Sequence, residues 1–258
     1  MKLYAKYISI HLKSQMQYKT SFFLTIFGQF IMSFTVLLGL YFMMSRFNNV
    51  GGFSLQQVLL CFAVVLMAFS LAECFARGFD LFPQMISNGE FDRALVRPRG
   101  LIFQVLAGKV EFTRLGRLIQ AILVFCYAIP ASGVIWSADK IFTLILMVVC
   151  GAFIFFGLFL IYASFTFFTI EGLEFMNMLT DGGREFGAYP YSIYGESILR
   201  FLTYIVPLAL FQYYPLLYLL DRETSLFYML SPVAGLLFLI PIYAFWRFGL
   251  YCYKSTGS

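Results

Sequence analysis

The sequence predicts an all-α protein that crosses a membrane six times. Six long runs without charged residues fill most of the 258 residues, and each reaches the roughly 20 residues that a helix needs to cross the hydrocarbon core of a bilayer. The composition agrees, because 61% of the residues are hydrophobic and only 12% are charged. Helices are the expected spanning form, since the runs lack the alternation of barrel strands and lipid offers no partner to an open backbone.

The basic residues set the expected orientation. With six crossings and both termini in the cytoplasm, only Arg46, Lys140 and Arg222 of the 18 basic residues lie outside, as the positive-inside rule requires. The net charge of +5 then describes a cytoplasmic face that attracts anionic lipid headgroups and does not indicate nucleic acid. We expect one transmembrane domain over residues 1–258, with spans at 20–45, 47–72, 118–138, 141–170, 201–220 and 224–246, of which 141–170 is either one long helix or a broken pair.

Residues 1–19 are expected to form a helix that lies on the membrane surface. Lys2, Lys6 and Lys13 recur at helical spacing, while Leu3 and Leu12 are apolar, which is typical of an amphipathic interfacial helix. This helix is either an elbow that packs beside a partner protein or a lipid-anchoring flank of the first span.

The first cytoplasmic loop, 73–117, is dense in charge and is expected to dock a partner inside the cell. In its centre a turn precedes Glu90 and Asp92, and Pro98 prevents continuation, which predicts a short helix. Phe91 and Leu95 share one face of it. That face either forms an apolar knob for a protein groove or contacts lipid. The candidate docking residues are Asn88, Gly89, Glu90, Phe91, Asp92, Arg93, Leu95 and Arg97.

A second cytoplasmic loop is expected over 171–197. Glu171 and Glu174 share a helix face there, but they follow an apolar run directly and are expected to be solvated rather than to bind a metal. In the fifth run, prolines free backbone groups that need other partners, so we expect this span to be broken toward the outer side. The candidate residues of an outer gate are Pro207, Tyr213, Tyr214 and Pro215.

The interior of the runs contains few side chains that could carry protons, ions or metals. Ionisable residues are almost absent there, which argues against an ion-coupled pathway. Aromatic residues crowd the fourth run, where they either line a cavity for amphiphiles or serve as packing. The candidate cavity residues are Phe155, Phe159 and Tyr162. We expect no metal site, because the single histidine and the five cysteines lack ligand spacing.

The chain also lacks a phosphate-binding loop of its own. Gly108-Lys109 is followed by Val110, and no earlier glycine stands at the required spacing. If the chain pumps a substrate, the energy is therefore expected to come from a partner.

Four segments at matching places in the topology carry a family resemblance. They are NGEFDRALVRP over 88–98, FGAYPYSIYG over 186–195, YIVPLALFQYYP over 204–215 and YKSTGS over 253–258. Together with the six-run layout they resemble bacterial type 2 ABC permeases. The greatest likeness is to a branch of similar length that includes multidrug or viologen exporters.

The resemblance implies a membrane subunit of an ATP-driven exporter in the bacterial cytoplasmic membrane. It implies pairing with a second permease, identical or homologous, and with two copies of a cytoplasmic ATPase that binds ATP and Mg²⁺, while this chain binds no cofactor. It also implies that 88–97 is a coupling helix and that residues from Pro207 onward close the outer side. The expected substrate is an amphiphilic or hydrophobic drug, peptide, lipid or glycolipid. Two other hypotheses are a membrane enzyme that acts on lipid-linked substrates and a scaffold that transports nothing.

Overall fold

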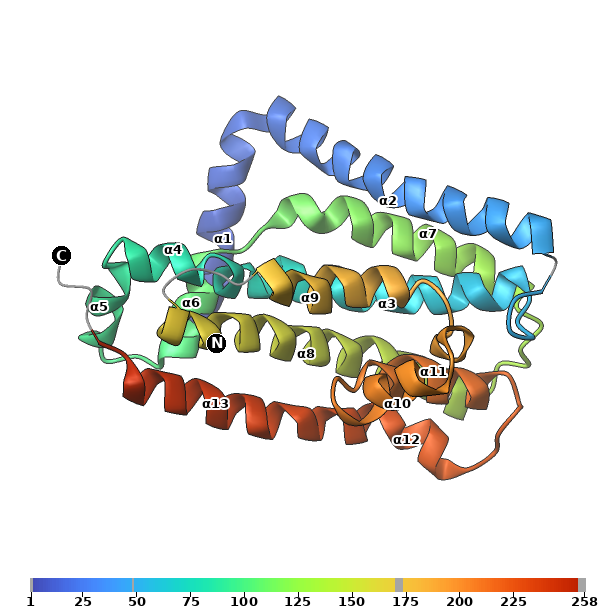
Figure 1. Ribbon diagram of the computed structural model, residues 1–258. Coiled ribbons are helices and arrows are strands. Elements are labelled where there is room, and N and C mark those ends of the chain that lie inside the picture. The colour runs from blue at the N-terminus through green and yellow to red at the C-terminus, as the bar shows by residue number, and fades with distance from the viewer. Residues whose placement is uncertain (1, 48, 170–173, 255–258) are drawn as a thin grey trace.

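The computed structural model describes residues 2–47, 49–169 and 174–254, which are almost entirely helical and form no strand (Figure 1). The remaining residues, which include Glu171 and the end of the last resembling segment, lie outside the described part. Long helices lie side by side in a bundle, and shorter ones gather at its two ends. The predicted all-α fold is therefore confirmed for the described chain.

Within the described residues, five helical stretches are long and apolar enough to cross a membrane. They are 3–47, 55–87, 112–131, 138–169 and 226–252, and they correspond in position to the first four predicted spans and the sixth. Their main helices are α2 (Lys19–Phe47), α3 (Leu55–Asp80), α7 (Leu115–Ala131), α8 (Ala138–Thr169), α12 (Leu226–Gly235) and α13 (Leu239–Cys252). The described part of the fourth run, 141–169, is one unbroken helix, because α8 continues through 32 residues.

The fifth predicted span, 201–220, is broken. It consists of α10 (Glu196–Tyr204) and α11 (Leu208–Leu219), and the two helices meet at a bend of 112°. Pro207 precedes the first residue of α11 at this bend, where its missing N–H and fixed ring favour the start of a new helix. If this bent pair counts as one span, the described chain holds up to six candidate spans.

Residues 174–197, which belong to the segment expected to be a second cytoplasmic loop, pack beside the central helices over much of their length. They contain α9 (Glu174–Phe186) and a short 3₁₀ turn at Tyr191–Tyr194. The guanidinium of Arg184 lies 5.0 Å from the ring centre of Phe69, and the Cys61 thiol is 3.7 Å from the Gly187 carbonyl. Because Cys61 and Phe69 belong to α3, α9 lies next to a predicted span. The charges of α9 concealed this placement, since spans are sought as uncharged runs.

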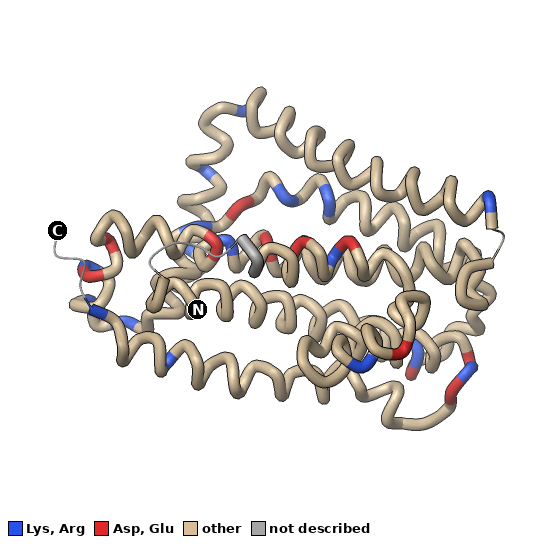
Figure 2. The backbone as a smooth tube through the Cα atoms, viewed as in Figure 1, with Lys and Arg blue, Asp and Glu red and all other residues tan. Residues whose placement is uncertain are grey.

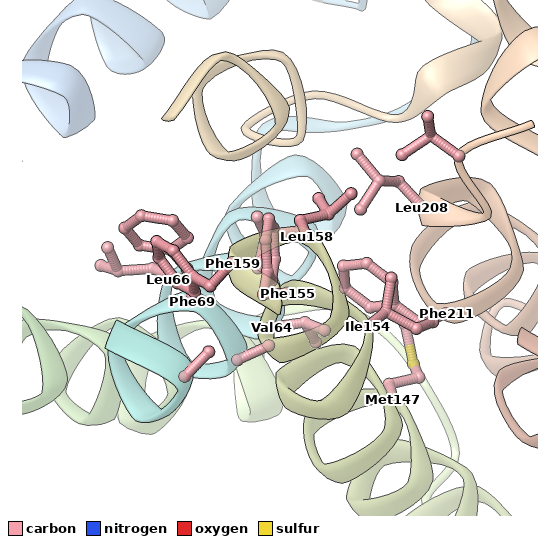
Figure 3. Packing of buried hydrophobic residues seen from close by; sticks show 14 of the residues in the cluster. Val64, Leu66, Phe69, Met147, Ile154, Phe155, Leu158, Phe159, Leu208 and Phe211 are labelled. Carbon is pink, nitrogen blue, oxygen red and sulfur yellow. The ribbon is translucent and has the colours of Figure 1, made fainter. Parts of the chain in front are cut away.

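The core sits where α3 and α8 pack together with α11. Phe155 of α8 contacts Phe69 of α3 edge-on at 5.1 Å between ring centres, and it contacts Phe211 of α11 at 5.7 Å. Phe159 packs beside them, as Figure 3 shows. In a bundle surrounded by lipid, helices associate mainly through van der Waals packing, and close contacts between such large rings provide it.

Both termini lie at the same end of the bundle (Figure 1). Helix α1 (Lys2–Gln15) is set at an angle to α2 and packs there, with Tyr4 at 5.9 Å from Phe103 and the His11 ring nitrogen 2.9 Å from the Ala107 carbonyl. Near the other terminus, the Tyr253 hydroxyl donates a hydrogen bond to the carboxylate of Asp92, which lies earlier in the same loop between α3 and α7. The position of α1 at the membrane surface stays a prediction.

Candidate functional site

Three short helices, which belong to the described residues, cap the end of the bundle toward which both termini lie. They are α4 (Phe82–Ser87), α5 (Glu90–Leu95) and α6 (Leu101–Gly108). Gly89 links the first two with a φ of 66°, a left-handed conformation that glycine adopts without steric cost. The short helix predicted after this turn is therefore present, and α5 begins at the predicted acid.

Phe91 does not form the exposed knob that the sequence suggested. Its side chain is 0% exposed and packs edge-on against Phe82 at 5.1 Å and Tyr253 at 5.0 Å. A third ring, Phe167 near the end of α8, lies 5.6 Å away. Sequence periodicity placed Phe91 and Leu95 on one face but did not reveal that α5 turns the first of them into the bundle. Phe91 thus connects α5 to the ends of α8 and α13.

Four exposed residues of α5 and the turn that follows it form a surface that we call the tip: Arg93, Leu95, Val96 and Arg97. Leu95 is 41% exposed and Val96 is 83% exposed, and both arginines are exposed. The predicted docking residues did not include Val96, which follows the last residue of α5. Its place as an apolar residue between arginines could have indicated that it belongs to the docking surface. The tip therefore presents two apolar side chains between two cations.

The tip is supported from behind by two hydrogen-bonded contacts. The Gln104 amide of α6 donates to the carbonyls of Ala94 and Arg99, both at 3.0 Å. The Tyr253 hydroxyl donates to the Asp92 carboxylate at 3.0 Å. Burial and this bond to a carboxylate raise the pKa of Tyr253 to about 12, so its hydroxyl stays a donor at neutral pH. The segment that carries the tip is thus fixed to both α6 and the end of α13.

Two of the remaining predicted docking residues border a hollow beside α5. This hollow has a volume of about 450 Å³ and is formed by α4, α5 and α6 with the end of α3. Asn88 and Glu90 line it and are exposed, and Arg93 and Arg97 reach it from the tip. The eight predicted residues are therefore adjacent, but only some of them are accessible to a partner.

A buried ion-pair network joins α3 to the start of α7. The Glu73 carboxylate, whose side chain is only 5% exposed, lies 2.7 Å from Arg117 and 3.2 Å from Arg114. Arg77 lies 3.2 Å from Glu111 and 3.7 Å from Glu73. The network stands between the capping helices and the middle of the bundle. Sequence reasoning missed it because its members are far apart along the chain.

Arg117 also borders a pocket between α2 and α9, which we call the charged pocket. Its volume is about 280 Å³, and Ser33, Thr35, Arg184 and Glu185 contribute polar groups to it. The guanidinium of Arg184 forms an ion pair with Glu185. Figure 2 shows the charged positions of α9 along the middle of the bundle, beside α3. The side chain of Arg184 is only 18% exposed, whereas those of Asp181 and Glu185 are 57% and 45% exposed.

The three aromatic residues expected to line a cavity lie elsewhere. Phe155 and Phe159 are buried in the core (Figure 3), and Tyr162 is half-buried farther along α8. None of the three borders the charged pocket. Phe155 and Phe159 are packing residues in this conformation, because rings at these positions point toward α3 and α11.

The four residues expected to form an outer gate belong to the α10–α11 hairpin. Tyr214 contacts the Thr203 hydroxyl at 3.2 Å and the ring of Tyr228 at 5.6 Å between centres. Tyr213 packs against Tyr214, and Pro215 lies inside α11. The hairpin is held to the chain after α9 by the Gln212 amide, which donates to the Tyr189 carbonyl at 2.7 Å. The hairpin therefore lies at the end of the bundle opposite the tip.

A comparison with protein-family models gives a match over most of the chain. The model described as ABC-2 family transporter protein matches residues 30–257, which is most of the chain. The chain belongs to the ABC-2 transporter family. No curated protein and no solved structure matches it. As an ABC-2 permease it is a multi-pass membrane subunit of a transporter, and members of this family normally work with an ABC ATPase.

Proposed function

We propose that this ABC-2 permease is half of the membrane part of an ATP-driven exporter in the bacterial cytoplasmic membrane. A second permease, identical or homologous, completes the membrane part. Two cytoplasmic ATPase subunits, which bind ATP and Mg²⁺, supply the energy. The observation that carries the proposal is the tip, because an exposed apolar pair flanked by arginines lies at the end of the bundle toward which both termini lie.

The tip suits an apolar groove with an acidic rim on the ATPase. A short helix that offers apolar anchors to a groove is a recurring mode of protein recognition, and flanking cations add orientation through charge complementarity. Phe91 packs against Phe167 and Tyr253. Movement of α5 by the ATPase would therefore be transmitted to the ends of α8 and α13.

The route for the substrate passes the charged pocket in this proposal. The pocket combines the apolar walls of Met32 and Leu66 with the charges of Arg117, Arg184 and Glu185. This combination suits an amphiphile whose polar group is held among the charges while its apolar part contacts α2 and α3. Drugs, peptides, lipids and glycolipids include such molecules. The α10–α11 hairpin, fixed at the opposite end, would close the route on the outer side.

A bulky side chain in the pocket is expected to block export. Thr35 borders the charged pocket and is exposed, and its hydroxyl bonds only the carbonyl one turn earlier. We expect Thr35→Trp to lower ATP-driven efflux by about tenfold or more, equivalent to about 1.4 kcal/mol of activation free energy. The measurement is efflux of a fluorescent amphiphile from proteoliposomes that contain the permease with its co-purified ATPase.

Thr25→Trp is the matched control, because Thr25 is also exposed on α2 and bonds its own helix in the same way, but it does not border the pocket. Efflux with Thr25→Trp should equal that of the unaltered chain. Equal efflux for the two tryptophan variants would contradict the proposed route. If the unaltered complex hydrolyses ATP but expels no amphiphile from the panel tested, the exporter itself is in doubt.

A further inference from the structure

The turn that ends α11 is fastened to the start of α8. We call residues 218–222 the strap. The ammonium of Lys140 lies 2.7 Å from the Asp221 carboxylate, and the Tyr218 hydroxyl donates to the Asp139 carboxylate at 2.7 Å. Asp139 and Lys140 belong to the first turn of α8, at the end of the bundle opposite the tip (Figure 1). These contacts therefore tie the α10–α11 hairpin to a central helix.

The strap also reaches the chain that precedes α3. The guanidinium of Arg222 donates to the Gly52 carbonyl and lies 4.1 Å from the ring centre of Phe53. Among the described residues other than glycine, Asp221 alone has a positive φ, of 55°. Aspartate and asparagine adopt this left-handed conformation more readily than most residues. The strap is thus a defined turn that bridges the starts of α3 and α8.

The position of Lys140 is unfavourable for a cation that lacks a partner. Its side chain is only 7% exposed, and burial of an unpaired charge removes its hydration without compensation. The first turn of a helix also disfavours a positive charge, because the helix dipole is positive there. Asp221 forms the only ion pair of Lys140 within the described residues, while the neighbouring Asp139 bonds Tyr218. Lys140 can therefore stay buried only while Asp221 remains beside it.

We infer that the Lys140–Asp221 pair is a latch that holds the α10–α11 hairpin closed, and that the two side chains separate when the hairpin opens. Separation is accessible because the Asp221 side chain is already 63% exposed, and movement of the strap would let water reach Lys140. The role of this opening in substrate release rests on the proposed function. The pairing and its effect on the hairpin do not.

The buried amine of Lys140 can itself report whether the latch is open. The full permease, with its co-purified ATPase, is placed in nanodiscs and treated with a small acetylating ester or a bulky biotin ester of the same reactivity. Labelling of Lys140 is quantified by peptide mass spectrometry. The ratio of biotin to acetyl labelling measures access, since both reagents need the same neutral amine and its abundance cancels. The exposed Lys6 gives the ratio for an open site.

Asp221→Asn removes the charge at a residue type that keeps the left-handed backbone. It leaves a buried cation unpaired, which favours the conformation in which water reaches Lys140. We expect the biotin-to-acetyl ratio at Lys140 to rise about tenfold, and addition of ATP to the unaltered complex should raise it too. Glu196→Gln is the control, because it breaks an exposed ion pair that lies within α10. It should leave the ratio unchanged.

Efflux of a fluorescent amphiphile is measured in parallel in proteoliposomes. The inference is overturned if Asp221→Asn leaves the ratio low, or if Glu196→Gln raises it equally. It is also overturned if the unaltered complex exports the amphiphile while ATP leaves the ratio unchanged. A complex in which Asp221→Asn exposes Lys140, but which exports nothing even when unaltered, would support the latch and contradict the proposed function instead.

Discussion

Replacing both Leu95 and Val96 by aspartate is expected to lower ATP-driven efflux by about a hundredfold while the permease still folds. Both side chains are exposed, so their loss should change the free energy of unfolding by only about 0.5 kcal/mol. In the proposed complex the new carboxylates would enter an apolar groove whose rim is acidic. Desolvation and like-charge repulsion there are expected to cost about 2.7 kcal/mol or more of binding free energy.

The control for this variant is Ile135→Asp, because Ile135 is 81% exposed and lies in the loop between α7 and α8. Efflux and ATP hydrolysis are measured together in proteoliposomes. We expect normal rates for the control and uncoupled or absent hydrolysis for the tip variant. Full efflux by the tip variant in an assembled complex would show that the tip does not transmit movement. Phe91 is less suitable for this test, since a substitution there would open a cavity in a buried aromatic cluster.

Glu73→Gln is expected to be the most destabilising of the conservative charge substitutions. The carboxylate of Glu73 is buried among Arg77, Arg114 and Arg117. Removal of one partner from a buried ion pair leaves the other charges uncompensated, which typically costs about 3–5 kcal/mol of unfolding free energy. The loss should be measured by denaturant titration in mixed micelles. Because Arg117 also borders the charged pocket, efflux should fall as well.

An exposed pair provides the comparison for Glu73. Glu196 and Arg200 form an ion pair on α10 with side chains 76% and 69% exposed, and such surface pairs contribute about 1 kcal/mol or less. Glu196→Gln should therefore be nearly neutral. The double substitution Glu73→Gln with Arg117→Gln should recover part of the loss, since it removes an unpaired cation. If Glu73→Gln and Glu196→Gln lower the free energy of unfolding by the same small amount, the network does not stabilise the bundle.

Structural features that depend on consecutive residues could be predicted from the sequence. A helix such as α8 is recognised from an uncharged run, because the length needed to cross a membrane is fixed and the residues that satisfy it are consecutive. The turn before α5 was likewise readable from Asn88-Gly89 and the acids that follow. The family resemblance rested on such consecutive segments, and it is confirmed by the match over residues 30–257.

Other features depend on partners that are distant along the chain. The helix α9 carries Asp181, Arg184 and Glu185, so it does not qualify as an uncharged run, yet its neighbours are Phe69 of α3 and Phe155 of α8. Periodicity grouped Phe91 with Leu95 on one face but gave no information on which of them the bundle would bury. Nor does a lysine at the start of an apolar run reveal that its partner lies in a distant turn. These properties arise from tertiary packing.

The most direct test of the account is photo-cross-linking from the tip. A benzoylphenylalanine placed at Val96 should form a covalent adduct with the ABC ATPase in native membranes, and the yield should change when ATP is added. The same group at Ile135 should give no ATPase adduct, because that position lies at the other end of α7. An adduct to the ATPase from Val96 alone would establish the tip as the docking surface. Adducts only to lipid from Val96, with the ATPase present and bound, would contradict the coupling role.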